Sequence, residues 1–393
     1  MQGVCQSPTN PGAMSTHPYR TLKRRFSSLM ARLSRRAALT PSQLRALRPR
    51  RILIVRQHNQ MGDMVCATPA LRAIRETWPE AELALITAPV NVEVVRHNPH
   101  LDHVVTFDRM MWRNPGMLFS FVRWMRNYRA EVAFVLSSVS FSVTSSAIAL
   151  ASGARYVVGG DSEPFGWDIS RHAFSLVMPS DPYQEIHAVE HNLVPLRAIG
   201  ITTDDLSTVV VPSAEETAYA RRILTDLELK PGFWAIHPGA GKKQNIWPAD
   251  RFAAVVRRAL AAGDEILILH GPADAEPLAE LVGLLEGDPD AGVKIAPACP
   301  VGVGAALLQM SDRFLCNDTG VMHMAGALRV PTVALFGPTD PELWRPPAHE
   351  VVVVQSPGPL KDPRGVDFGW MENIDVDTVW EAWHGLPGRS QAT

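Results

Sequence analysis

Residues 313–344 constrain the fold more than any other stretch of the chain. Two short apolar runs, 313–316 and 332–336, predict buried strands, and residues 321–328 between them have the spacing of an amphipathic helix. Strands joined by one helix pair in parallel. The polar residues that follow each strand therefore meet at one edge of the sheet, the carboxyl edge, where open parallel sheets bind ligands.

The rest of the second half repeats this alternation, which predicts a parallel sheet with helices on both faces. Further strands are expected at 233–237, 265–270, 293–296 and 351–354, and helices at 214–227, 275–285, 302–310 and 377–383, with one more after Pro248.

The first half shows the same pattern. Strands are expected at 51–56, 81–86, 104–107, 132–136 and 156–160, and helices at 63–76, 90–96, 117–128, 143–151 and 185–199. Residues 165–182 are interpreted as a long surface loop. Because residues 202–212 break the pattern, we expect one domain over 51–210 and a second over 211–393.

Residues 132–153 contain no charged residue, so a transmembrane span has to be considered. Seven serines and one threonine in these 22 residues argue against it. A strand, a loop and a buried helix fit the sequence better.

Residues 1–50 form a basic N-terminal extension. Residues 1–51 carry 11 of the 38 Lys and Arg residues and no Asp or Glu. Residues 1–18 are interpreted as disordered, with Met14 and Met30 as alternative starts. Residues 19–47 suggest a basic amphipathic helix, so residues 19–51 are either a contact to an anionic membrane surface or a solvated tail.

The composition, 46% hydrophobic and 20% charged, is that of a soluble globular protein. Its four cysteines have no metal-ligand spacing, which favours reduced thiols and argues against structural zinc. No acidic pair with metal spacing occurs among the motifs, and no metal is expected.

The turn at 317–320 is the first candidate binding site. A helix that begins at Thr319 or Gly320 directs free backbone N–H groups and its positive dipole end outward, which suits an anion. A similar turn at 239–243 lacks the Gly and the Ser or Thr of a P-loop, because Ile236 and Lys243 occupy those positions.

Three motifs resemble glycosyltransferase family 9, the heptosyltransferases of lipopolysaccharide core assembly. They are NDTGVMHMAGALRVPTVALFGPTDPELW at 317–344, ILIVRQHNQMGDMVCATPALRAIRETWP at 52–79, and the HPGA…WP loop at 237–248. The resemblance implies an α/β, GT-B fold in which two Rossmann-like domains face each other across a cleft.

The implied activity is inverting transfer of heptose from ADP-heptose to a lipid-linked saccharide, with no cofactor beyond the donor. The expected partners are a nucleotide sugar and that acceptor, not nucleic acid. The expected location is the cytoplasm, peripheral at the inner face of the plasma membrane. Alternatives are a family 9-like transferase that uses another nucleotide sugar, a GT-B nucleotide-sugar epimerase, and a non-catalytic sugar-nucleotide-binding protein.

The resemblance also assigns roles to residues near the two helix starts. Asp63, after Gly62, takes the position of the catalytic base, although an acid there also suits a helix cap. Thr319 and Gly320 would meet the leaving diphosphate. Asp318 would accept hydrogen bonds from sugar hydroxyls, because as an anion it would repel phosphate.

Other positions match the family less well or have two readings. Asn245 stands where the family usually has a lysine, so Lys242 or Lys243 would supply the missing charge, unless both are simply solvated. Glu276 aligns with a nucleotide-side residue and also suits a first helical turn. His323 is a ligand contact or a structural residue. Ser137 and Ser138 replace an acid and a glutamine that family members often carry.

Overall fold

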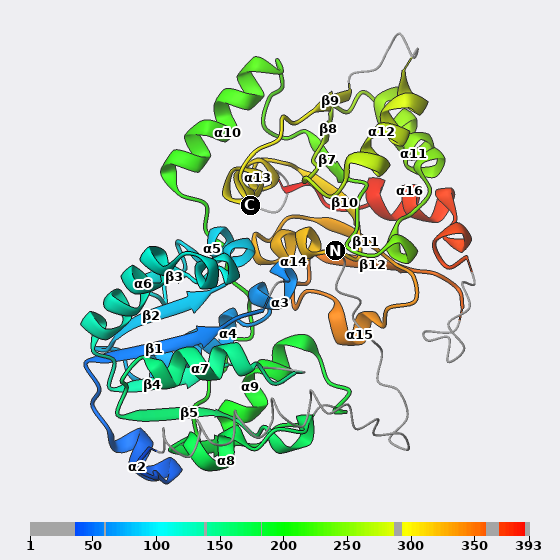
Figure 1. Ribbon diagram of the computed structural model, residues 1–393. Coiled ribbons are helices and arrows are strands. Elements are labelled where there is room, and N and C mark those ends of the chain that lie inside the picture. Colours follow the sequence, from blue (N-terminus) through cyan, green and yellow to red (C-terminus); the bar gives the residue numbers. More distant parts are fainter. Residues whose placement is uncertain are drawn as a thin grey trace.

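A computed structural model describes residues 36–58, 60–136, 140–181, 183–286, 293–358 and 369–389. The chain folds into two lobes, each built on one parallel six-stranded sheet (Figure 1). The sheet orders are β3-β2-β1-β4-β5-β6 and β12-β11-β10-β7-β8-β9. Both correspond to the doubly wound order 3-2-1-4-5-6, in which the strand order reverses beside the first strand.

The first lobe carries the earlier elements of the chain. Its strands are β1 (Arg51–Arg56), β2 (Glu82–Thr87), β3 (His103–Thr106), β4 (Val132–Val135), β5 (Tyr156–Gly160) and β6 (Leu176–Met178). Its helices are α2 (Pro41–Ala46), α3 (Met61–Val65), α4 (Thr68–Thr77), α5 (Pro89–Val95), α6 (Pro115–Tyr128), α7 (Val143–Ala151), α8 (Ile169–Ala173) and α9 (Ala188–Ala198), with 3-10 turns η1 (Arg109–Arg113) and η2 (Glu163–Phe165).

The second lobe carries the later elements. Its strands are β7 (Trp234–His237), β8 (Ile266–Ile268), β9 (Val293–Ile295), β10 (Arg313–Asn317), β11 (Thr332–Phe336) and β12 (Val351–Gln355). Its helices are α10 (Ala214–Asp226), α11 (Ala249–Ala261), α12 (Ala275–Leu285), α13 (Val301–Gln309), α14 (Gly320–Ala327), α15 (Pro341–Trp344) and α16 (Val376–His384), with 3-10 turns η3 (Lys243–Asn245) and η4 (Met371–Asn373).

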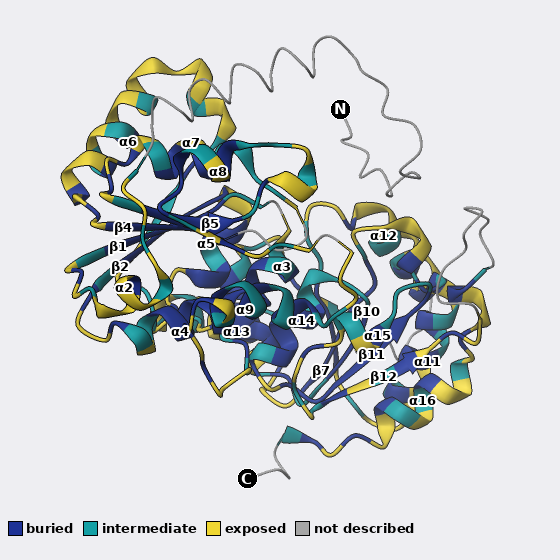
Figure 2. Ribbon diagram, turned by 90° about the horizontal axis from the view of Figure 1, so that it is seen from below, coloured by how far each residue is buried: buried dark blue, intermediate teal, exposed yellow. Residues whose placement is uncertain are grey.

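Side-chain alternation along β1 explains how the sheets are covered. Ile52 and Ile54 join one buried cluster, whereas Leu53 and Val55 join another on the opposite face. The cluster on the Ile52 side continues into the second lobe, where it includes Phe336. The strands are accordingly buried while the outer helices carry the exposed surface (Figure 2).

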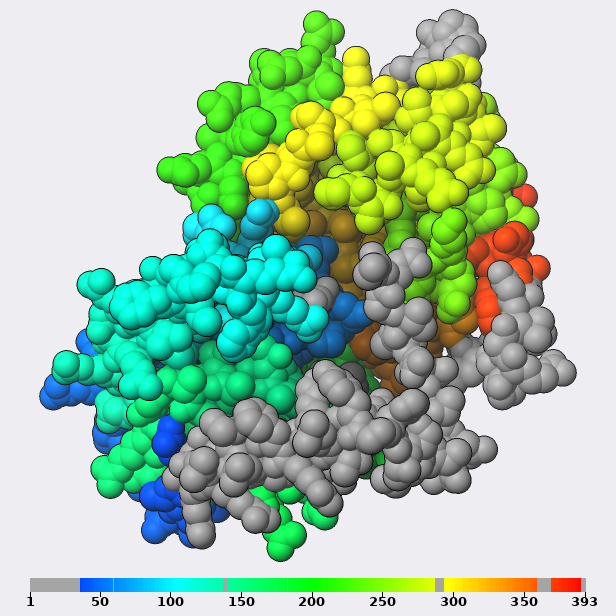
Figure 3. Space-filling view, viewed as in Figure 1, coloured from blue at the N-terminus to red at the C-terminus, as the bar shows by residue number. Residues whose placement is uncertain are grey.

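The lobes also touch through polar contacts. The backbone N–H of Gly302 in α13 donates to Glu93 Oε2 of α5 at 3.3 Å, and His187 Nε2 lies 2.7 Å from the carbonyl oxygen of Arg345. In the space-filling view, first-lobe atoms in light blue lie against second-lobe atoms in yellow (Figure 3). The expected domain boundary at residues 210 and 211 falls between α9 and α10.

Three expectations on secondary structure need correction. The helix expected at 63–76 is two helices, because Pro69 supplies no N–H and starts a new helix, α4. Residues 165–182 are not one loop: they contain α8 and β6, which are too short to show a periodicity.

The third correction concerns the helix expected at 19–47. Residues 36–40 are not helical, and α2 starts at Pro41, which disfavours a helical conformation before it. The described end of the extension, residues 36–50, packs on the first lobe: Leu44 is fully buried, and Arg45 Nη1 donates to the carbonyl oxygen of Ile199 at 2.7 Å. Residues 1–35 lie outside the described part of the chain.

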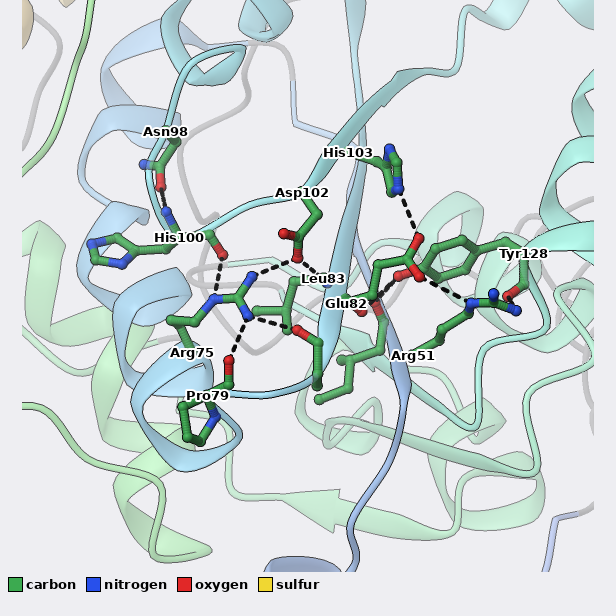
Figure 4. Close-up of polar contacts among 12 residues, drawn as sticks. Arg51, Arg75, Pro79, Glu82, Leu83, Asn98, His100, Asp102, His103 and Tyr128 are labelled. Carbon is green, nitrogen blue, oxygen red and sulfur yellow. Dashed lines mark hydrogen bonds and ion pairs between the residues drawn. The ribbon is translucent and has the colours of Figure 1, made fainter.

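The amino edge of the first sheet holds a polar network. Glu82 pairs with Arg51 at 3.0 Å and with His103 at 2.7 Å, and Asp102 pairs with Arg75 at 2.6 Å (Figure 4). A cavity of about 410 Å³ at this edge is lined by positively charged arginine and negatively charged glutamate side chains. It lies at the opposite end of the strands from the motifs described above.

Candidate active site

The starts of α3 and α14 meet between the two lobes. A Cβ atom on Gly62 would lie 2.7 Å from His323 Cδ2 and 3.5 Å from the Cα atom of Gly320. A Cβ atom on Gly320 would lie 3.4 Å from the backbone N of Gly62. Glycine at both positions therefore allows the two backbones to approach closely. Two motifs that lie about 250 residues apart in the chain are therefore neighbours in the folded protein.

Asp63 is in the first turn of α3 and does not cap the helix. The N-cap residue is Gln60, which makes no side-chain cap hydrogen bond. Instead, Asp63 Oδ2 lies 2.5 Å from His58 Nε2, and the Asp63 side chain is only 12% exposed. Within the described residues, its second oxygen, Oδ1, has no hydrogen-bond partner and remains available to a bound hydroxyl.

The surroundings of Asp63 favour its ionised form. Burial alone would raise the pKa of this carboxyl, but the hydrogen bond and charge of His58, together with the charge of Arg56, hold the pKa below its usual value. Arg56 is itself buried, and its Nη2 donates to the backbone carbonyl oxygen of Asp63 at 3.1 Å. An ionised carboxylate is therefore present at neutral pH.

His58 is the residue that the sequence analysis missed. It lies in the turn between β1 and α3, five positions before Asp63, and its side chain is about one-third exposed. The sequence did offer a signal for it, because His58 is a titratable residue only five positions before the candidate base. His58 lies inside the matched motif at 52–79, but the resemblance assigned a role only to the Gly-Asp pair.

His323 fills the space between α3 and α14. Its side chain is 5% exposed, and its Nδ1 lies 3.4 Å from the Sγ atom of Cys66. Burial lowers the pKa of His323 to about 4, although the nearby Asp63 charge opposes this shift. The ring is therefore neutral at pH 7. A direct ligand contact for His323 stays a prediction.

In the second lobe, the loops at the carboxyl edge are held together by buried polar pairs. Asn317 Nδ2 donates to the carbonyl oxygen of Pro238 at 2.8 Å, and Asn317 Oδ1 accepts from the backbone N–H of Trp247 at 3.1 Å. His237 Nε2 lies 3.1 Å from Asp274 Oδ2. These contacts fix the HPGA…WP loop beside the start of α14, at the reversal of strand order between β7 and β10.

Asn245 and Asp318 are direct partners. Asn245 is 3% exposed, and its Nδ2 donates to Asp318 Oδ2 at 2.9 Å and approaches Thr339 Oγ1 at 3.4 Å. Burial raises the pKa of Asp318, while the Thr339 hydroxyl and the Lys242 charge oppose the shift. Asn245 stands where the family usually has a lysine. In this chain it donates a hydrogen bond to the carboxylate of Asp318.

The two candidate lysines differ in their surroundings. Lys243 Nζ lies 3.3 Å from Glu276 Oε2, and both side chains are at least 80% exposed. Lys242 is also exposed, but its charge acts on Asp318 at the start of α14. Lys243 and Glu276 thus form a solvated pair, whereas the charge of Lys242 favours the ionised form of Asp318.

Thr319 occupies the N-cap position of α14 without a side-chain cap hydrogen bond. Its hydroxyl is therefore not used by the helix. Ser137 and Ser138 lie outside the described residues. Among the described residues, no group of three or more His, Cys, Asp or Glu side chains has the arrangement of a metal site.

Comparisons with known proteins agree with these motifs. Residues 120–364 match the model of "Glycosyltransferase family 9 (heptosyltransferase)". The chain is 22% identical over 292 residues to lipopolysaccharide heptosyltransferase 3 of Escherichia coli, which covers 74% of this chain and 85% of that protein. It is also 22% identical over 315 residues to lipopolysaccharide heptosyltransferase 1 of E. coli O18:K1:H7, covering 78% of this chain and 92% of that protein.

Solved structures share the fold. A glycosyl transferase family 9 protein from Veillonella parvula has a TM-score of 0.74 at 21% identity, covering 86% of this chain and 97% of its own. E. coli ADP-heptose lipopolysaccharide heptosyltransferase II has a TM-score of 0.70 at 19% identity, covering 86% and 98%. The expected GT-B architecture of two Rossmann-like domains is confirmed.

Proposed function

Because the chain belongs to glycosyltransferase family 9, and is thus a glycosyltransferase, we propose that it transfers a heptose or related sugar from ADP-heptose. The acceptor is a hydroxyl group of a lipopolysaccharide core or another lipid-linked saccharide. The meeting of the α3 and α14 starts carries this proposal, because it brings a carboxylate and an anion-binding helix start to one place.

In the proposed reaction, Asp63 is the base. Its Oδ1 takes the proton of the acceptor hydroxyl as that oxygen attacks the anomeric carbon, and the bond from this carbon to the diphosphate breaks. A single displacement of this kind inverts the anomeric configuration. Proton removal by a positioned base contributes about 10²–10⁴-fold to the rate.

Three second-lobe groups are proposed to stabilise the leaving diphosphate. The free backbone N–H groups at Thr319 and Gly320 and the helix dipole act on its charge, and the Thr319 hydroxyl donates to a phosphate oxygen. Lys242 supplies the cation that Asn245 does not. Asp318, held by Asn245, binds sugar hydroxyls.

We propose supporting roles for the remaining residues. Gly62 allows the backbone contact between the lobes, and His58 orients the Asp63 carboxylate. His323 packs between α3 and α14 and fixes their relative position, and Glu276 binds the donor ribose when its ion pair with Lys243 opens.

The proposed location is the cytoplasmic face of the membrane, with residues 19–51 as a basic contact to anionic lipid and domains divided at residues 210 and 211. No helix in the described ranges has both the length and the apolar character of a membrane span.

The test starts with the donor. Thermal shifts are measured with ADP-, UDP- and GDP-sugars, and ADP release is then followed with a lipid-linked saccharide acceptor from membrane extract. We expect stabilisation by ADP-heptose and acceptor-dependent ADP release, which Asp63→Asn lowers about 10²–10⁴-fold. Stabilisation by UDP-sugars alone contradicts the heptose donor, and product without acceptor indicates an epimerase. Donor binding without turnover indicates a non-catalytic binding protein.

A further inference from the structure

The segment formed by η1 and the start of α6 exposes large apolar side chains. The exposed fractions are 57% for Met110, 60% for Trp112, 47% for Met117 and 68% for Phe119. Side chains of this size are usually covered in a folded protein, and several in one segment indicate a contact surface. We call Met110, Trp112 and Phe119, with Arg109, Arg113, Arg123 and Arg126, the η1–α6 surface.

The same segment is strongly basic. Residues 109–129 contain five arginines and no aspartate, glutamate or lysine. All five arginines are exposed, and none forms an ion pair with a carboxylate anywhere in the described ranges. Arg129 lines the cavity at the amino edge together with three glutamates, so the other four arginines are those whose charges are free to meet an anionic partner.

The geometry of α6 places apolar and basic groups on one outward face. Phe121, Met125 and Tyr128 are buried against the lobe. Phe119 and Arg123 are four positions apart, and Arg126 follows three positions later, which puts them together on the opposite face.

Trp112 extends this surface into η1. Its ring packs edge-on against Phe107, with ring centroids 5.8 Å apart, so it is held in place although most of it is exposed. The cyan and turquoise atoms of this part of the chain form an open outer face of the first lobe (Figure 3).

The η1 end of this surface lies at the same edge of the sheet as the candidate base, whereas Arg123 and Arg126 lie in the half of α6 that runs toward the amino edge. All strands of the first sheet are parallel, so η1, which follows β3, and Asp63, which follows β1, both lie at the carboxyl edge. β3 is two strands away from β1, or about 10 Å.

We propose that the η1–α6 surface docks on an anionic phospholipid bilayer, with Trp112 and Phe119 at the level of the headgroups and the arginines on lipid phosphates. Aromatic and basic side chains together are the composition of interfacial membrane contacts. The inference goes beyond the proposed transfer reaction, because binding to lipid requires neither donor nor acceptor.

The test is co-sedimentation of the full chain with vesicles of phosphatidylglycerol and phosphatidylcholine, against vesicles of phosphatidylcholine alone. We expect binding to the anionic vesicles only. Arg123→Gln with Arg126→Gln should weaken it about 30-fold at low ionic strength, about 5-fold for each charge. Trp112→Ser with Phe119→Ser should weaken it at least 10-fold. Tyr219→Ser, which removes an exposed aromatic ring from α10 of the second lobe, is the matched control and should bind as the wild type does.

Other outcomes overturn the proposal. Unchanged vesicle binding by both double variants assigns the contact to the N-terminal basic segment alone. Loss of self-association in the variants, measured by sedimentation velocity, with vesicle binding retained, assigns the surface to a second copy of the chain. Donor-induced thermal shifts with the same variants separate a failure of docking from a failure of the proposed transferase function.

Discussion

The contact between Gly62 and His323 gives the most direct test of how the lobes meet. Gly62→Ala adds a Cβ atom 2.7 Å from His323 Cδ2, whereas carbon atoms pack comfortably at about 3.5–4.0 Å. The ring cannot move aside into solvent, because His323 is only 5% exposed and its Nδ1 contacts Cys66. Overpacking of this kind costs about 1–3 kcal/mol, and the better helix propensity of alanine returns about 0.5–1 kcal/mol.

We therefore expect Gly62→Ala to lower the free energy of unfolding by about 1–2 kcal/mol. Gly304→Ala in α13 is the matched control, because no atom outside its own helix lies within 4 Å of its Cβ position. The control should be neutral or slightly stabilising, so the difference between the two variants isolates the steric cost, about 1–3 kcal/mol.

The assay is urea unfolding at pH 7, followed by circular dichroism. Combining Gly62→Ala with His323→Ala removes the obstructing ring, so the double variant should lose less stability than the two single variants added together. The reasoning fails if Gly62→Ala is as stable as Gly304→Ala, because α3 and α14 would then not be in contact.

Four further predictions concern the polar groups of the site. Asp63→Asn should lower turnover about 10²–10⁴-fold while donor-induced thermal shifts persist; unchanged turnover rules out Asp63 as the base. Asn245→Ala removes the amide donor of the half-buried Asp318 carboxylate and leaves it only the Thr339 hydroxyl, so urea unfolding should show a loss of about 1–3 kcal/mol, and no loss contradicts the pairing. Lys242→Ala should weaken ADP binding in calorimetric titration more than Lys243→Ala; the reverse order assigns the diphosphate to Lys243. Because the pKa of folded His323 is about 4 and its usual value is 6.5, the unfolded chain binds more protons between these values, so stability should fall as pH drops from 6.5 to 4. His323→Gln should flatten that part of the urea-derived stability profile, and an unaltered slope assigns it to other groups.

Local sequence signals predicted most of the fold. Strands such as 51–56 and 332–336 have clear apolar runs, and the structure ends them at the predicted residues. β6 has three residues and α8 has five, and segments this short contain no full period of either pattern.

The motifs at 52–79 and 317–344 contain the two helix starts that the structure brings together, but they do not show which side chains form pairs there. The pairing of Asn245 with Asp318 joins residues 73 positions apart, and only the arrangement of the second sheet brings them together. The His58 contact with Asp63 depends on how the chain turns between β1 and α3, which spacing alone does not define.

The buried apolar cluster shared by the two lobes limits how the enzyme moves. It includes Met64 of α3 and Met322 of α14, so a wide separation of these helices would expose apolar surface at about 25 cal/mol per Å². Because the two lobes share this buried surface, we expect them to unfold in a single calorimetric transition. A donor that binds the second lobe would in this way protect the first lobe from heat and from proteolysis.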